Sequence, residues 1–142
     1  MQLCSVSVVV DVDADLVESS VDDMNQTEDR IVSHWREISA DEQHQLRDSV
    51  DEILRPLGFR TRLLVVERDN SLALYFLCMT LAALMSLRDL WRRQRLRDTL
   101  QSLFTILSRA TRTVRVNRLS WPLNDYQRCL EFFKAVEGKL TI

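Results

Sequence analysis

The sequence predicts an α+β fold of the ferredoxin-like (split βαβ) class, a four-stranded antiparallel sheet with helices packed on one face. Two kinds of periodicity support this prediction. Apolar residues alternate in four short segments, as in strands, and they recur at helical spacing in the segments between and after them. The chain has 142 residues, of which 46% are hydrophobic and 28% charged, so we expect residues 1–142 to form a single domain.

Four segments have the pattern of strands. Valines alternate with other residues through the first strand, which begins at Ser5. Asp69 and Asn70 favour a tight turn between the second and third strands, which are therefore expected to form a hairpin. The predicted strands span residues 5–13, 61–68, 72–79 and 113–120.

The segments between the strands have the pattern of helices. A short helix is predicted over residues 31–38. Ser39 and Glu42 have capping-box spacing before a second helix, which ends near Pro56. By contrast, residues 11–29 are acidic and lack helical periodicity, so we interpret them as a solvated, mobile loop.

Helical spacing returns after the third strand. A five-residue step from Trp91 to Leu96 breaks its register, which predicts two helices or a bend near residues 93–95. A final helix is predicted to start after Pro122 and to end near Gly138. The resulting order, β-α-β-β-α-β with a trailing helix, is that of the split βαβ fold.

The longest uncharged run extends from Asn70 to Leu87 and could be either a membrane span or a buried core segment. The arginines that follow it resemble the positive flank of a membrane helix. However, its first half is strand-like and its second half is helix-like. We therefore expect a strand that passes into a helix near Thr80, and no membrane span.

No arrangement of residues indicates catalysis. His34 and His44 have no partner at ligand or triad spacing, and the only glycines, Gly58 and Gly138, cannot form a phosphate-binding loop. We expect a non-enzymatic protein without a metal or another cofactor. The three cysteines are isolated in the sequence, which favours small buried thiols and a reducing, cytoplasmic location; they are Cys4, Cys78 and Cys129.

The charges are unevenly distributed along the chain. Residues 1–59 contain 14 acidic and 4 basic side chains, whereas residues 60–142 contain 7 acidic and 15 basic ones. The simplest interpretation is that the two halves pack together and neutralise each other. The alternative is a basic nucleic-acid-binding domain that uses the arginine cluster at 88–97, namely Arg88, Arg92, Arg93, Arg95 and Arg97.

A four-stranded sheet with helices on one side leaves its other face open. Strict alternation turns an apolar centre surrounded by charged residues toward this face, which is the usual composition of a protein-docking surface. The occupant would be a partner protein, a terminal segment or a second copy of the chain. RNA binding is less favoured because the RNP1 pattern is absent and only Tyr75 could stack a base. The predicted partner-binding residues are Arg62, Leu64, Val66, Glu67, Arg68, Tyr75 and Arg115.

Three segments resemble the family of the N-terminal domain of TRADD, the TNF-receptor-associated death-domain adaptor. They are "LLVVERDNSLALYF", "LRDLWRRQRLRDTLQSLF" and "YQRCLEFF", and the resemblance covers roughly residues 59–137. It implies an α/β sandwich that acts as an intracellular adaptor in death and immune signalling and docks TRAF proteins through its sheet side. The chain departs from the family pattern where Arg93, Gln94 and Arg95 replace a glycine-containing segment, and where Glu67 and Asp69 replace polar hairpin residues.

Overall fold

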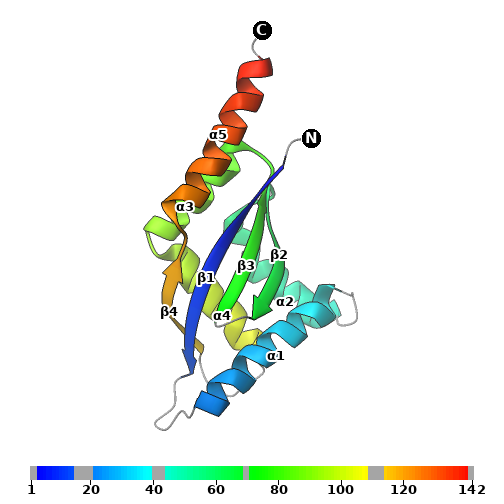
Figure 1. The fold of residues 1–142 in the computed structure, drawn as a ribbon. Helices are drawn as coiled ribbons and strands as arrows, with labels where there is room; N and C mark the ends of the chain where they lie inside the picture. The colour runs from blue at the N-terminus through cyan, green and yellow to red at the C-terminus, as the bar shows by residue number, and fades with distance from the viewer. Residues whose placement is uncertain (1–2, 15–20, 40–43, 69–70, 109–113, 141–142) are drawn as a thin grey trace.

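The computed structural model describes residues 3–14, 21–39, 44–68, 71–108 and 114–140, which form an α+β fold around one four-stranded sheet (Figure 1). The strand order is β2-β3-β1-β4, and every neighbouring pair is antiparallel. The strands are β1 (Cys4–Ala14), β2 (Thr61–Arg68), β3 (Leu72–Cys78) and β4 (Val114–Ser120).

Five α-helices and one 3₁₀ turn accompany the sheet in the described residues. They are α1 (Val21–Ser39), α2 (His44–Leu54), η1 (Arg55–Leu57), α3 (Leu81–Arg92), α4 (Arg95–Ser108) and α5 (Leu123–Leu140). Helix α4 contacts α1, α2 and β4, and in Figure 1 α2 and α4 lie behind the strands. Helix α5 runs beside the first half of β1 and contacts α3.

The core lies between the sheet and these helices. Each strand contributes alternate buried side chains, such as Val8 of β1 and Leu74 of β3, and α4 contributes a row of leucines that includes Leu100 and Leu103. Burying such side chains supplies most of the driving force for folding, at about 1.5–3 kcal/mol for each large aliphatic residue. The predicted alternation of β1 is confirmed, since Val6, Val8, Val10 and Val12 are all buried.

The uncharged run divides as the sequence predicts. Strand β3 ends at Cys78, and α3 begins at Leu81. Thr80 is the N-cap of α3, and its hydroxyl oxygen accepts a hydrogen bond of 3.0 Å from the Ala83 amide. Within the described residues no helix is long and apolar enough to cross a membrane.

The predicted break after Trp91 is also confirmed. Helix α3 ends at Arg92 and α4 begins at Arg95. Between them Gln94 adopts φ of 62°, in the left-handed region where glycine is favoured. The residue that allows the chain to change direction here is thus a glutamine.

The interpretation of residues 11–29 as a loop is wrong for most of their length. Strand β1 extends through Ala14, and α1 begins at Val21. The predicted short helix at 31–38 is the second half of α1, so one long helix replaces a loop and a short helix. Part of the predicted capping box and the turn at 69–70 lie outside the described residues.

The cysteines are not all free. Cys4 at the start of β1 and Cys129 in α5 form a disulfide, with Cα atoms 6.0 Å apart. Their sequence separation of 125 residues hid this pairing from sequence reasoning. Cys78 is free and buried, and burial raises the pKa of its thiol to about 11, so this thiol stays protonated and unreactive near neutral pH.

Candidate interaction surface

One face of the sheet has no helix packed across it among the described elements. The strand register and the pattern of buried residues together show which side chains lie on this face. Ser7 of β1 lies opposite Tyr75 of β3, and Val9 lies opposite Ala73. These residues alternate with the buried valines of β1 and the buried Leu74 of β3. They therefore point away from the core, as the sequence predicts for Tyr75.

A β-bulge in β2 overturns part of the predicted site. Strict alternation would turn Val66 and Arg68 outward. Instead, the register with β3 shifts between Leu63 and Val65, so Val66 pairs with Leu74 on the core side. Val66 is only 2% exposed and belongs to the core. A bulge adds one residue to a strand and reverses the facing of every residue after it.

Arg68 is likewise turned toward the helices. Its guanidinium contacts Glu28 at 3.1 Å and Asp29 at 3.0 Å, both in α1. Burial raises the pKa of Glu28, while the hydrogen bond and the charge of Arg68 act in the opposite direction. Arg68 thus connects the end of β2 to α1 and is not part of the outer face.

With this correction, five predicted residues remain on the outer face or at the bulge. Arg62 pairs with Leu77, and Glu67 pairs with Ala73. Leu64 is the extra residue of the bulge and is 46% exposed. On the same face Val65 is 36% exposed, and Val9 on β1, beyond β3, is 41% exposed. We call this surface the uncovered face; it consists of Val9, Arg62, Leu64, Val65, Glu67, Ala73, Tyr75, Leu77, Arg115 and Arg118.

Val65 and Arg118 also contribute to the uncovered face, although strict alternation would turn both inward. A second register shift, between Asp11 and Val12, places Arg118 opposite Asp11. The segment from Leu63 to Val66 is apolar throughout, so its alternation cannot locate the bulge. The run of four apolar residues is itself the only signal that the pattern is interrupted.

Charged side chains surround the apolar centre of this face. Arg62 and Glu67 are exposed on β2, and Arg115 and Arg118 are exposed on β4. Asp11 is half-buried and accepts a hydrogen bond from the Ser71 hydroxyl. Asp13 of β1 lies opposite Arg115 in the register of β1 and β4. The boundary therefore contains both arginines and acidic groups, which favours a partner with charged side chains at matching positions.

The arginine cluster at 88–97 does not form a single basic surface. Arg88 lies over Trp91, Trp121 and Tyr126, with its guanidinium carbon 4.1–5.0 Å from their ring centroids. It also donates a hydrogen bond of 3.0 Å to the Trp121 carbonyl. Arg88 therefore stabilises the packing of α3 against the start of α5.

The rest of the cluster is only partly available to a ligand. Arg93 forms an ion pair of 3.3 Å with Asp89, and Arg97 is half-buried. Arg92 and Arg95 are exposed. Two exposed arginines with a third that is already paired give weaker support for phosphate binding than the five predicted residues.

Side chains from the helices cap two edges of the sheet. The amides of Val114 and Val116 in β4 donate to Thr105 Oγ1 at 3.1 Å and to Gln101 Oε1 at 3.0 Å. Strand β4 pairs with β1 only from Val9 onward. Helix α5 caps the remaining edge of β1, where the Ser7 amide donates to Asp125 and the Ser5 carbonyl accepts from Arg128.

The third edge, on β2, is capped at one point in the described residues. The Trp35 indole donates a long hydrogen bond, 3.4 Å, to the Leu64 carbonyl. Capping of this kind prevents unwanted pairing between sheets.

In comparisons with known proteins, no family model matches this chain and no curated protein matches it.

Proposed function

We propose that this chain is a non-enzymatic protein–protein interaction module of an intracellular signalling adaptor, which docks a partner protein on the uncovered face. The observation that carries this proposal is the exposure of Val9, Leu64 and Val65 together on one sheet face. Apolar side chains grouped in this way and bordered by charges are typical of interaction sites.

The mechanism would be docking onto a surface that is already formed. A partner would bury the apolar centre, including Tyr75, and would orient itself by charges that complement Arg62 and Arg115. An interface of standard size buries on the order of 1,600 Å² in total. A rigid sheet surface loses little conformational entropy on binding, which favours affinity.

The finer assignment of fold and partner is also a proposal. The strand order β2-β3-β1-β4 supports the split βαβ, ferredoxin-like arrangement. The resemblance of residues 59–137 to the TRADD N-terminal domain supports a TRAF-type partner and a cytoplasmic location. In a reducing cytoplasm Cys4 and Cys129 would be present as thiols for part of the time, so the proposed function does not depend on their disulfide.

The test compares two substitutions on the uncovered face with a matched one elsewhere. Leu64→Asp and Tyr75→Ala should abolish binding to the C-terminal domain of a TRAF protein, measured by biolayer interferometry. Met85→Asp is the control, because Met85 is similarly exposed, at 52%, but lies on α3. It should bind like the wild type.

Two outcomes would contradict the proposal. One is normal binding by Leu64→Asp with an unchanged far-UV circular dichroism spectrum. The other is a wild-type chain that binds no TRAF domain but self-associates in sedimentation equilibrium until Leu64 is changed. The second result would assign the uncovered face to another copy of this chain.

A further inference from the structure

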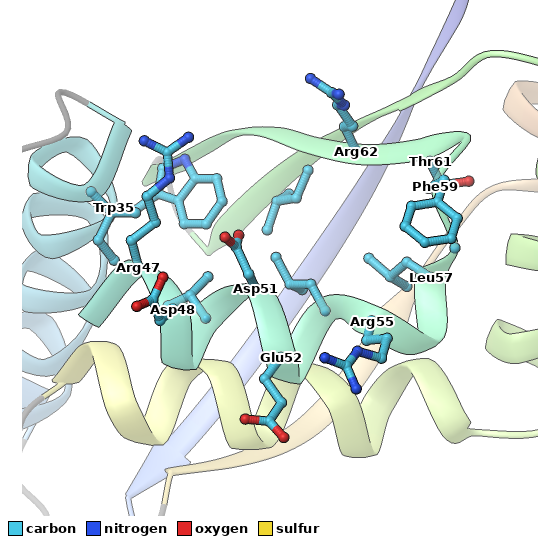
Figure 2. Close-up of a pocket in the computed structure, with 15 residues that line it drawn as sticks. Trp35, Arg47, Asp48, Asp51, Glu52, Arg55, Leu57, Phe59, Thr61 and Arg62 are labelled. Carbon is cyan, nitrogen blue, oxygen red and sulfur yellow. The ribbon is translucent and has the colours of Figure 1, made fainter. Parts of the chain in front are cut away.

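A groove of about 920 Å³ lies between α2 and the first half of β2, on a different side of β2 from the uncovered face. Figure 2 shows the strand along one wall and the helix along the other. Trp35 of α1 stands at one end, and Phe59 stands at the end where α2 connects to β2. Phe59 is 95% exposed.

The strand wall presents unpaired main-chain groups. The Met79 amide donates a hydrogen bond of 2.8 Å to the Arg60 carbonyl, and Arg62 pairs with Leu77. Because bonding direction alternates along an antiparallel strand, Arg60 and Arg62 bond toward β3. The main-chain groups of Thr61 and Leu63 therefore point toward the groove, and they have no partner among the described residues.

The base of the groove is apolar. Its buried members come from α1, α2, η1 and β2, and they are Trp35, Ile38, Val50, Leu57 and Leu63. The Thr61 side chain also lines it and is 4% exposed. Apart from the weakly interacting thiol of Cys78, the Thr61 hydroxyl has no hydrogen-bond partner in the described part of the chain.

Charged groups of both signs face the strand across the groove. In Figure 2 the Asp51 carboxylate and the Arg47 guanidinium point from α2 toward β2, whereas Glu52 points to the opposite side of α2 and Arg62 points away from the groove. Arg47 already interacts with another group, which leaves the carboxylate of Asp51 for a ligand. Asp51 and the neighbouring Asp48 are exposed. A cationic side chain lying between α2 and β2 would be attracted to this carboxylate.

We propose that the groove binds an extended basic peptide, which adds to β2 as a further strand. Its main chain would pair with Thr61 and Leu63 at the usual strand spacing of about 4.8 Å. Alternate side chains of the peptide would face α2. The apolar ones among them would pack on the base of the groove, and a lysine or arginine among them would pair with Asp51. Strand addition of this kind combines main-chain affinity with side-chain specificity.

Three features favour this occupant together. The free main-chain groups require an extended backbone, the buried base requires apolar side chains, and Asp51 requires a positive charge. A second copy of the chain is less favoured. If the β2 edges of two copies paired, their two Arg62 side chains would lie on the same face of the joined strands, where like charges repel.

The probe is the acetylated hexapeptide Val-Ser-Lys-Ser-Val-Ser, whose valines and lysine share one face of an extended strand, titrated into the ¹⁵N-labelled full chain. The amides of Thr61 and Leu63 should shift and become protected from hydrogen exchange. A peptide with glutamate in place of lysine should bind about threefold or more weakly, and Asp51→Lys should reverse that preference. Tyr75→Ala should bind the lysine peptide normally, which separates this site from the uncovered face.

A matched pair of variants tests the main-chain contact. Thr61→Pro removes the free amide at the first residue of an edge strand, where proline is tolerated, and should abolish binding. Thr61→Val keeps the amide and should bind like the wild type. If Thr61→Pro fails to fold, a peptide N-methylated at its valines tests the same contact on the wild-type chain and should not bind.

Several results would overturn the proposal. They are equal binding of the N-methylated peptide, equal binding of the lysine and glutamate peptides, and shifts confined to Val9 and Tyr75. Protection of Thr61 and Leu63 that rises with protein concentration in the absence of peptide would also overturn it, because a second copy would then occupy the edge.

Discussion

The sheet has two outer strands, β4 and β2, and they differ in how their free edges are satisfied. Thr105 and Gln101 cap successive free amides of β4, and α5 extends the cover along β1 through Asp125. On β2 the described residues cap the edge only at the Leu64 carbonyl, and the edge before it borders a groove. The edges of β4 and β1 are therefore closed to further strand pairing, whereas the first half of the β2 edge is available for binding.

The largest expected effect tests the closed side. Reducing the disulfide between Cys4 and Cys129 should lower the free energy of unfolding by about 2–4 kcal/mol, because the link closes a very long loop. Urea denaturation with and without a reductant measures it. The double variant Cys4→Ala/Cys129→Ala is the control and should not respond to the reductant. An unchanged wild-type midpoint would show that α5 covers β1 without this link.

The next effect concerns a single cap on β4. Gln101→Ala leaves the Val116 amide without its acceptor and should cost about 1–2 kcal/mol in the free energy of unfolding. Gln127→Ala is the matched control, because Gln127 is exposed in α5 and should change stability little. Equal losses in the two variants would mean that the capping bond contributes nothing beyond helix propensity.

A smaller effect, opposite in sign, is expected on β2. Thr61→Val removes a buried hydroxyl that lacks a strong partner and should leave stability unchanged or raise it by up to about 1 kcal/mol. Thr105→Val should instead destabilise by about 1–2 kcal/mol, since the Thr105 hydroxyl accepts from Val114 and donates to Gln101. Thermal unfolding of both variants measures these two changes in stability. A change of the same sign in both variants would contradict the proposed difference between the edges of β2 and β4.

The smallest effect tests the covered half of β2, which Arg68 connects to α1. The folded-state pKa of Glu28 is raised above its ordinary value of 4.5, mainly by burial. A raised carboxyl pKa stabilises the fold at low pH, and this contribution is lost as the pH rises through the folded-state value. The wild type should therefore lose stability relative to Glu28→Gln between about pH 4 and pH 7. A stability difference that moves the other way would contradict the assigned direction.

The sequence predicts the order of strands and helices well where one periodicity dominates. Alternating valines identify β1. The change of period near Thr80 locates the start of α3, because the residues on the buried face recur at different intervals in a strand and in a helix. The prediction fails at α1. Its first part is too acidic to reveal an apolar stripe, although the helix continues into the well-packed Ile31 and Trp35.

The candidate site was predicted less well, for a physical reason. Register is a property of two paired strands, and one apolar run such as Leu63 to Val66 does not reveal where a bulge falls. Val66 and Arg68 were assigned to the wrong face on this account. The groove beside β2 was not predicted at all, because it is formed by the separation of α2 from a strand edge.

The contact between β1 and α5 has a consequence for synthesis on the ribosome. The first strand leaves the exit tunnel long before Asp125 and Arg128, the residues that satisfy its Ser7 and Ser5 edge. Contacts between elements that lie far apart in the sequence are slow to form, since a large loop must close before they contribute. The nascent chain should therefore leave the Ser5 and Ser7 edge of β1 uncovered until α5 has left the tunnel, even after β1 has paired with β3.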